Sequence, residues 1–285
     1  MDTVESHITP RTFRVAFPED IPRHWANGSA FLTAVLNTYT LLVPDNELYY
    51  MRTLRKTLGR IDDTGLKDDL LAFFRQEGEH GMAHRRYRDN LRAQGYRFDS
   101  FVNIVGFLLY RIIEPILPLK LHVAIVAAIE HFNALLGHLF LKNDILRDSD
   151  PRMKLLFEFH FSEEIEHKAV SVDALRAIGG GEFIRISGMV IAAPLLYLTF
   201  TVGTVMFLVQ DRQLLRGRTI RDMWQHFFTR DGMVWGSLVL LGRYCLPGFH
   251  PSDIDDAELA RNVFRGEFAN RDSYPQVESS AGIEP

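Results

Sequence analysis

The pattern Glu-x-x-His occurs twice in the chain, at Glu77–His80 and at Glu164–His167. In a helix, residues three apart lie on the same face, so each pattern directs a carboxylate and an imidazole toward one point. Carboxylate oxygens and imidazole nitrogens suit iron and manganese as ligands. Two such helices that face each other across a core would form a metal centre, and this requirement constrains the fold more than any other feature.

An acidic residue precedes each pattern inside an otherwise apolar run. Glu47 lies 30 residues before Glu77, and Glu130 lies 34 residues before Glu164. This separation suits two antiparallel helices joined by a short loop, and the 53 residues from Glu77 to Glu130 leave room for a long crossover. The order predicts an all-α fold: a ferritin-like four-helix bundle with one long crossover, followed by extra C-terminal apolar helices.

The predicted metal ligands are four carboxylates and two imidazoles: Glu47, Glu77, His80, Glu130, Glu164 and His167. Four carboxylate charges would repel one another in a core of low dielectric, and two divalent cations would cancel them. The expected cofactor is two Fe ions, with Mn or a mixed Fe/Mn pair as the alternative. One Glu-x-x-His is commonly a solvated helix face, but two matched ones favour a metal site. No catalytic residue beyond the metal ligands is predicted.

Three further histidines lie near these patterns. His84 follows the first pattern by one helical turn, and His160 precedes the second glutamate by one turn. Each is expected to be an additional metal ligand, a proton relay or a group hydrogen-bonded to a ligand. His131 directly follows Glu130 and points about 100° away along the helix, so packing or an indirect contact with the site is expected there.

The spacing of apolar residues predicts helices over most of the chain. Val43–Pro44 is expected to interrupt the first helix, and Gly179–Gly181 to end the fourth. The expected helices cover residues 29–61, 66–94, 101–116, 119–146, 151–178 and 186–209, with a shorter apolar segment at 233–241. The predicted domains are an N-terminal segment at 1–28, the di-metal bundle at 29–181, an apolar helical extension at 182–250, and a C-terminal helix with a flexible tail at 251–285.

Residues 186–209 form a run of 24 residues without a charge, long enough to cross a bilayer. Association with a membrane surface through this segment is expected. The alternative is a helix buried in the bundle or in an oligomer interface, such as that of a homodimer. The N-terminal residues do not form a secretory signal, so a cytoplasmic location is expected.

Composition excludes several classes of protein. The 32 basic and 36 acidic residues nearly balance, with a net charge of −4, so no nucleic-acid partner is expected. Cys245 is the only cysteine, which rules out an internal disulfide framework and any multi-cysteine zinc or iron–sulfur site.

Several sequence blocks resemble a bacterial family described as metal-dependent hydrolases. The blocks are FRQEGEH at 74–80, HRRY at 84–87, AIEHF at 128–132 and HFSEEIEHKAV at 160–170, with GGG at 179–181 and PGFHP at 247–251. The resemblance extends from about residue 11 to 250 and implies a ferritin-like metal protein. It also implies roles: bridging carboxylates Glu77 and Glu164, terminal carboxylates Glu47 and Glu130, and terminal imidazoles His80 and His167.

Three functions compete for such a chain. Because doubled Glu-x-x-His helices are typical of di-iron carboxylate proteins, the main expectation is an oxidoreductase that activates O2 to oxidise an organic, apolar substrate. The alternative is a metal-dependent hydrolase that uses a metal-bound hydroxide. A ferroxidase or iron-binding protein comes third, since roughly 100 residues after the fourth helix would burden a storage cage. The expected partners are a small organic or lipid-like substrate, O2 and an unidentified electron donor.

Overall fold

A computed structural model describes residues 8–12, 15–18, 20–229 and 233–266. Over these ranges every regular element is a helix, and no strand occurs. The prediction of an all-α fold is therefore confirmed. The tail predicted to be flexible lies outside the described residues from residue 267 onward.

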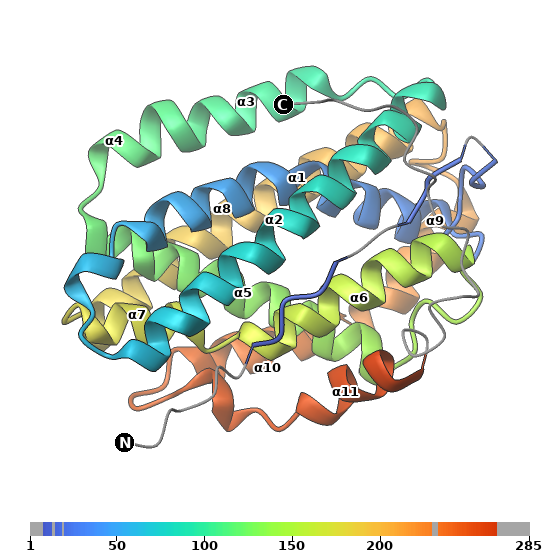
Figure 1. The fold of residues 1–285 in the computed structure, drawn as a ribbon. Coiled ribbons are helices and arrows are strands. Elements are labelled where there is room, and N and C mark those ends of the chain that lie inside the picture. Colours follow the sequence, from blue (N-terminus) through green and yellow to red (C-terminus); the bar gives the residue numbers. More distant parts are fainter. Residues whose placement is uncertain (1–7, 13–14, 19, 230–232, 267–285) are drawn as a thin grey trace, which may run out of the picture.

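Four long helices form the body of the molecule (Figure 1): α1 (Ala30–Arg55), α2 (Thr64–Ala93), α5 (Leu119–Lys142) and α6 (Pro151–His167). Helix α1 packs along α2, and α5 packs along α6. This pairing of sequence neighbours is consistent with the predicted ferritin-like bundle.

A long crossover joins the two helix pairs and runs along the outside of the molecule, at the top of Figure 1. It consists of α3 (Asp99–Phe107), the π-helical segment η2 (Leu108–Ile113) and α4 (Glu114–Ile116). The crossover therefore lies between Glu77 and Glu130, in the interval where the sequence predicted it.

Side-chain caps fix where three of the bundle helices begin. The Ser29 hydroxyl accepts from the backbone N–H of the third residue of α1, and Asp63 does the same for α2. The Asp150 carboxylate accepts from Arg152 N, and Pro151 occupies the first turn of α6. Each cap satisfies a backbone donor that has no partner inside its helix.

The expected break at Pro44 is absent, because α1 continues through this residue. Helix α2 packs closely here, since Gly81 has no side chain: a Cβ at Gly81 would lie 3.1 Å from Glu47 Oε2 and 3.8 Å from Pro44 Cα. Packing along the helix outweighs the lost backbone hydrogen bond of the proline. The fourth predicted helix also differs, because α6 ends at His167 and a separate helix, α7 (Val170–Ala177), follows.

The C-terminal helices pack onto the bundle. They are α8 (Glu182–Gln210), α9 (Gly217–Met223), the π-helical segment η3 (Trp224–Phe228), α10 (Met233–Tyr244), the short 3-10 turn η4 (Pro251–Asp253) and α11 (Ala257–Gly266). Helix α8 lies against α5 and α1, while α11 packs on α6. A Cβ at Gly188 would lie 2.3 Å from Ala124 O, so this glycine permits the close contact between α8 and α5. The domain boundary expected at residue 182 stays a prediction.

By length and composition alone, α5 and α8 are apolar enough to cross a membrane. The apolar window of α5 is 94% buried inside the protein, as in a core helix, whereas that of α8 is 28% buried. The segment expected at 186–209 is thus helical and largely exposed. Its association with a membrane and the cytoplasmic location both stay predictions.

Candidate metal centre

The six predicted metal ligands meet inside the four-helix bundle. Glu47 comes from α1, Glu77 and His80 from α2, Glu130 from α5, and Glu164 and His167 from α6. None of the six is more than 2% exposed. A cluster of four carboxylates and two imidazoles is thus withdrawn from solvent, where each charge is costly without a compensating partner.

The two histidines of the repeated pattern point into this cluster. His167 Nε2 lies 3.0 Å from Glu77 Oε1, and His167 Nδ1 lies 3.1 Å from Glu130 Oε2. His80 Nδ1 lies 3.6 Å from Glu47 Oε1 and 3.7 Å from Glu77 Oε1. Ligand atoms from all four bundle helices therefore converge.

Two groups of side chains within the cluster could each hold a metal ion. The first is Glu47, His80, His160 and Glu164, and the second is Glu77, His80, Glu164 and His167. In each group the ligand atoms lie within 4.8 Å of one another. The groups share His80 and Glu164, so two ions held there would be neighbours. Glu130 belongs to neither group but contacts the second through His167.

Unsatisfied polar atoms are concentrated at this cluster. Among the described residues, 15 buried side-chain nitrogen or oxygen atoms have no hydrogen-bond partner, and 10 of them belong to the six predicted ligands. They include both carboxylate oxygens of Glu47, Glu77 and Glu130 and both ring nitrogens of His167. Buried polar groups in proteins normally have partners. Metal cations would supply them, so the donor set fits metal ions.

The electrostatics of the carboxylates leads to the same conclusion. Burial, reinforced by the charge of Glu77, raises the pKa of Glu47 well above its usual range and that of Glu130 to about 7. Burial and the charge of Glu130 likewise raise the pKa of Glu164. Ionising these carboxylates is therefore costly unless a positive charge lies nearby, and divalent cations would provide that charge.

His80 is oriented by Glu163, a carboxylate outside the six predicted ligands. Its Nε2 lies 2.9 Å from Glu163 Oε2, and the Arg11 guanidinium donates to Glu163 Oε1 at 3.3 Å. Glu163 is fully buried. A carboxylate bonded to one ring nitrogen fixes the histidine so that the other nitrogen faces the metal site, here Nδ1.

The two histidines whose role was open differ in position. His160 belongs to the first group: its Nε2 lies 2.9 Å from Glu164 Oε1, and its Nδ1 lies 3.2 Å from His84 Nε2. His84 is outside both groups, and its other ring nitrogen lies 3.0 Å from Thr40 Oγ1. Burial lowers the pKa of both histidines well below the usual range, which favours neutral rings. His84 thus supports His160, which is itself a candidate ligand.

His131 does not join the cluster. Its ring packs against Tyr244, with 4.7 Å between ring centroids, and against Phe249. Its Nε2 lies 3.4 Å from Leu240 O, and burial lowers its pKa to about 4. His131 is therefore a core histidine that contacts the C-terminal helices.

Sequence reasoning missed two side chains that touch the centre. Asn133 donates from Nδ2 to Glu164 Oε1 at 3.3 Å, and the Tyr39 hydroxyl lies 2.7 Å from His160 Nε2. Asn133 follows Glu130 by three residues, so its place on the same helix face was a usable signal. Nothing in the sequence distinguishes Tyr39 from the other aromatic residues of the core.

Fold and cluster together define an all-α protein with a buried site suited to metal ions. A model of the family described as predicted metal-dependent hydrolases matches residues 9–255. The chain therefore belongs to this family, which confirms the resemblance seen in the sequence. No curated protein and no solved structure matches the chain.

The family assignment corrects the main functional expectation. The family is described by metal-dependent hydrolysis, and nothing in the comparison points to O2 activation or oxidation of a substrate. The expectation of an oxidoreductase that activates O2 to oxidise an organic substrate is therefore wrong, whereas the expected partners stay untested. It failed because carboxylate and imidazole ligands serve both chemistries, so ligand spacing predicts a metal site without selecting the reaction.

Proposed function

We propose that this protein is a hydrolase whose bundle core binds two divalent metal ions, of iron or manganese. The observation that carries the proposal is the concentration of unpartnered carboxylate and imidazole atoms in two adjoining groups. Membership of a family described as predicted metal-dependent hydrolases supports hydrolysis as the reaction class. Carboxylate-rich sites with imidazole ligands suit iron and manganese.

Bound divalent cations would polarise the bond to be cleaved and lower the pKa of a water molecule, so that water attacks at neutral pH. The residues of this chain then hold the geometry. Asn133 fixes Glu164, Glu163 fixes His80, and His84 fixes His160 through the contacts described above. Such supporting contacts commonly set the affinity and orientation of metal ligands.

Tyr39 lies beside the cluster, with its hydroxyl 2.7 Å from His160 Nε2. It lines a small cavity of about 10 Å³ together with Glu47 and Asn133, beside the cluster. Burial raises the pKa of Tyr39 well above its usual range, so the phenol keeps its proton at neutral pH. We assign Tyr39 as a hydrogen-bond donor to the polarised oxygen of the substrate, an interaction that stabilises charge as it develops.

The test compares turnover with and without metal on a panel of carboxylic esters, amides and phosphate esters. Removing metal with a chelator is expected to abolish hydrolysis, and restoring Mn²⁺ or Fe²⁺ is expected to recover it. Zn²⁺ serves as a third arm that tests metal identity. A protein that binds two ions and hydrolyses none of the panel would contradict the proposal.

A matched pair of variants links turnover to the cluster. Glu77→Gln removes a carboxylate from the second group, whereas Glu79→Gln changes a half-buried glutamate of the same helix outside both groups. We expect Glu77→Gln to lose metal and turnover together and Glu79→Gln to keep both. Equal loss in both variants would show that general damage to α2 is responsible.

A further inference from the structure

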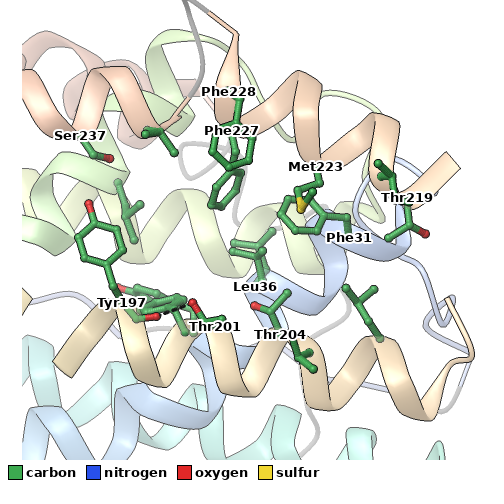
Figure 2. Close-up of a pocket in the computed structure, with 18 of the residues that line it drawn as sticks. Phe31, Leu36, Tyr197, Thr201, Thr204, Thr219, Met223, Phe227, Phe228 and Ser237 are labelled. Atoms are coloured by element: carbon green, nitrogen blue, oxygen red, sulfur yellow. Dashed lines mark hydrogen bonds between the residues drawn. The ribbon is translucent and has the colours of Figure 1, made fainter. Parts of the chain in front are cut away.

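An apolar cavity of about 360 Å³ lies beside the metal centre, between α8 and the segment formed by α9, η3 and α10. Figure 2 shows Thr201 and Thr204 of α8 on one side and Met223 and Phe227 on the other, with Leu36 of α1 between them. Pockets that bind small molecules have volumes of roughly 300–1,000 Å³. The cavity is therefore large enough for a ligand.

The walls of this cavity carry no charged side chain among the described residues. Leucine, valine and phenylalanine side chains dominate, and the polar groups are hydroxyls such as those of Thr201, Thr204 and Ser237. A charged ligand would lose its hydration here without gaining an ionic partner. The lining therefore selects an uncharged hydrocarbon group.

Two aromatic side chains separate the inner end of the cavity from the metal centre. Tyr39 and Phe200 line both this cavity and the small cavity of about 10 Å³ that contacts Glu47. The Tyr39 hydroxyl lies 2.7 Å from His160 Nε2. Two aromatic side chains thus form the wall between the apolar cavity and the candidate ligands, and their rotation would join the two spaces.

The outer end of the cavity reaches the surface. Tyr197, Val205, Ile220 and Phe228 line it and are between 39% and 47% exposed. At the inner end, Leu36 and Tyr39 are 3% exposed or less. The cavity is therefore a path from an apolar rim on the surface toward the metal centre.

We propose that this cavity binds the alkyl chain of the substrate, and that the bond to be hydrolysed lies at the inner end of the chain, next to Tyr39. The substrate is then a linear alkyl-chain ester or amide with a small leaving group, because the metal-side cavity of about 10 Å³ has room for about one water-sized group. The inference rests on the proposed hydrolase function for the identity of the reaction.

The reaction needs no co-reactant except water. Water adds its hydroxyl to the acyl carbon, the acyl C–O or C–N bond breaks, and the departing oxygen or nitrogen takes the remaining proton. The chain stays in the apolar cavity as a carboxylic acid. Burial of the chain contributes to binding, whereas cleavage depends on the metal centre, so the two can be measured separately.

The test measures binding of decanol and butanol to the full chain by calorimetry. These neutral probes report chain binding without using the metal. Each buried methylene contributes about 0.8 kcal/mol, so the affinity is expected to rise about fourfold per methylene between the two alcohols. An absence of length dependence, or tighter binding of naphthol than of decanol, would overturn the assignment to an alkyl chain.

Two variants locate the bound chain. Thr204→Phe fills the cavity from the buried side of α8 and is expected to weaken decanol binding about tenfold or more, since a filled pocket excludes the chain. Val202→Phe is the matched control, because Val202 is 49% exposed on the same helix and does not line the cavity. Thr201→Trp, at the exposed side, tests the same point if Thr204→Phe misfolds. If Thr204→Phe or Thr201→Trp folds and still binds decanol with unchanged affinity, the proposal is overturned.

A failure of this inference is distinguishable from a failure of the proposed function. Glu77→Gln is expected to abolish hydrolysis and to leave decanol binding intact. Decanol binding without metal-dependent hydrolysis of decanoate esters would contradict the function and keep the chain-binding cavity. Equal hydrolysis of methyl butyrate and methyl decanoate, without decanol binding, would contradict the cavity assignment alone.

Discussion

Helices α5 and α8 are both long and apolar, but their surroundings are opposite. Their apolar windows have mean hydropathies of 1.5 and 1.9, yet 94% of the first window and 28% of the second are buried. Helix α5 is surrounded by other helices, namely α1, α6, α7, α8, α10 and α11. Helix α8 packs chiefly against α5 and α1 and covers the bundle on one side only. Hydropathy along the chain therefore predicts that a helix is apolar but not what covers it.

The two helices also contribute differently to function. Helix α5 carries Glu130 and Asn133 to the cluster of candidate ligands, all of which are buried. Helix α8 supplies one wall of the apolar cavity, including Thr204, and presents its other face outward. Helix α5 also lines the cavity, through Phe132, Leu136 and Phe140, whereas α8 contributes no candidate ligand. Four experiments test how the two helices differ in burial and in metal binding.

The largest expected effect is the loss of metal from the α5 variant Glu130→Ala. The two carboxylate oxygens of Glu130 lack hydrogen-bond partners, and Glu130 Oε2 lies 3.1 Å from His167 Nδ1. Removing this carboxylate is expected to abolish binding of the metal ion held by the second ligand group, which Glu130 contacts through His167. Elemental analysis measures this, with the exposed Lys142→Ala of the same helix as control. Full metal content in Glu130→Ala would remove Glu130 from the ligand set.

The next effect compares one substitution on both helices. Val126 of α5 is fully buried, and Val190 of α8 is 65% exposed. Val126→Asp would bury an unpaired carboxylate and is expected to lower the free energy of unfolding by about 4 kcal/mol or more. Val190→Asp is expected to change it by less than about 0.5 kcal/mol. Chemical denaturation distinguishes these values. A large loss for Val190→Asp would mean that α8 is covered in solution.

A smaller effect is expected where the two helices touch. A Cβ at Gly188 would lie 2.3 Å from the backbone oxygen of Ala124, so Gly188→Ala forces α8 away from α5. We expect a loss of about 1–3 kcal/mol in the free energy of unfolding, typical of overpacking. Gly106→Ala in α3 has open space around it and is expected to stabilise the chain by about 0.5–1 kcal/mol. Equal effects of the two substitutions would show that the α5–α8 contact is loose.

The smallest effect concerns Asn133, which supports a ligand without being one. Its hydrogen bond to Glu164 Oε1 is long, at 3.3 Å, so Asn133→Ala is expected to weaken metal affinity by about tenfold, the low end for supporting residues. Competition with a chelator of known affinity measures the change. An unchanged affinity in Asn133→Ala would limit its role to packing.

Much of the bundle could be predicted because its helices follow simple rules. Apolar spacing and caps such as Asp150 mark the helices, and the interval between the two patterns marks the crossover. The same spacing correctly predicted that the six proposed ligand side chains lie close to one another. Their role as metal ligands stays a prediction. Residues three or four apart share a helix face whatever the tertiary structure, so local patterns of this kind are reliable.

Other features depend on contacts between distant residues and were not predictable. Pro44 stays within α1, where it lies beside Gly81 of α2, and no local pattern reveals this contact. The apolar cavity combines side chains from Phe31 to Ser237, which no local pattern connects. The reaction was also wrongly predicted, since the same ligands serve oxidation and hydrolysis and only the family assignment separates them.

The most direct test of the central claim is a titration of metal-free protein with Mn²⁺ or Fe²⁺, followed by the rate of ester hydrolysis. The two adjoining ligand groups predict that the rate rises with added metal and reaches its plateau at about two equivalents per chain. A decanoate ester is the substrate of choice. Hydrolysis that survives complete metal removal, or its absence with two ions bound, would contradict the claim that this buried cluster is the centre of a metal-dependent hydrolase.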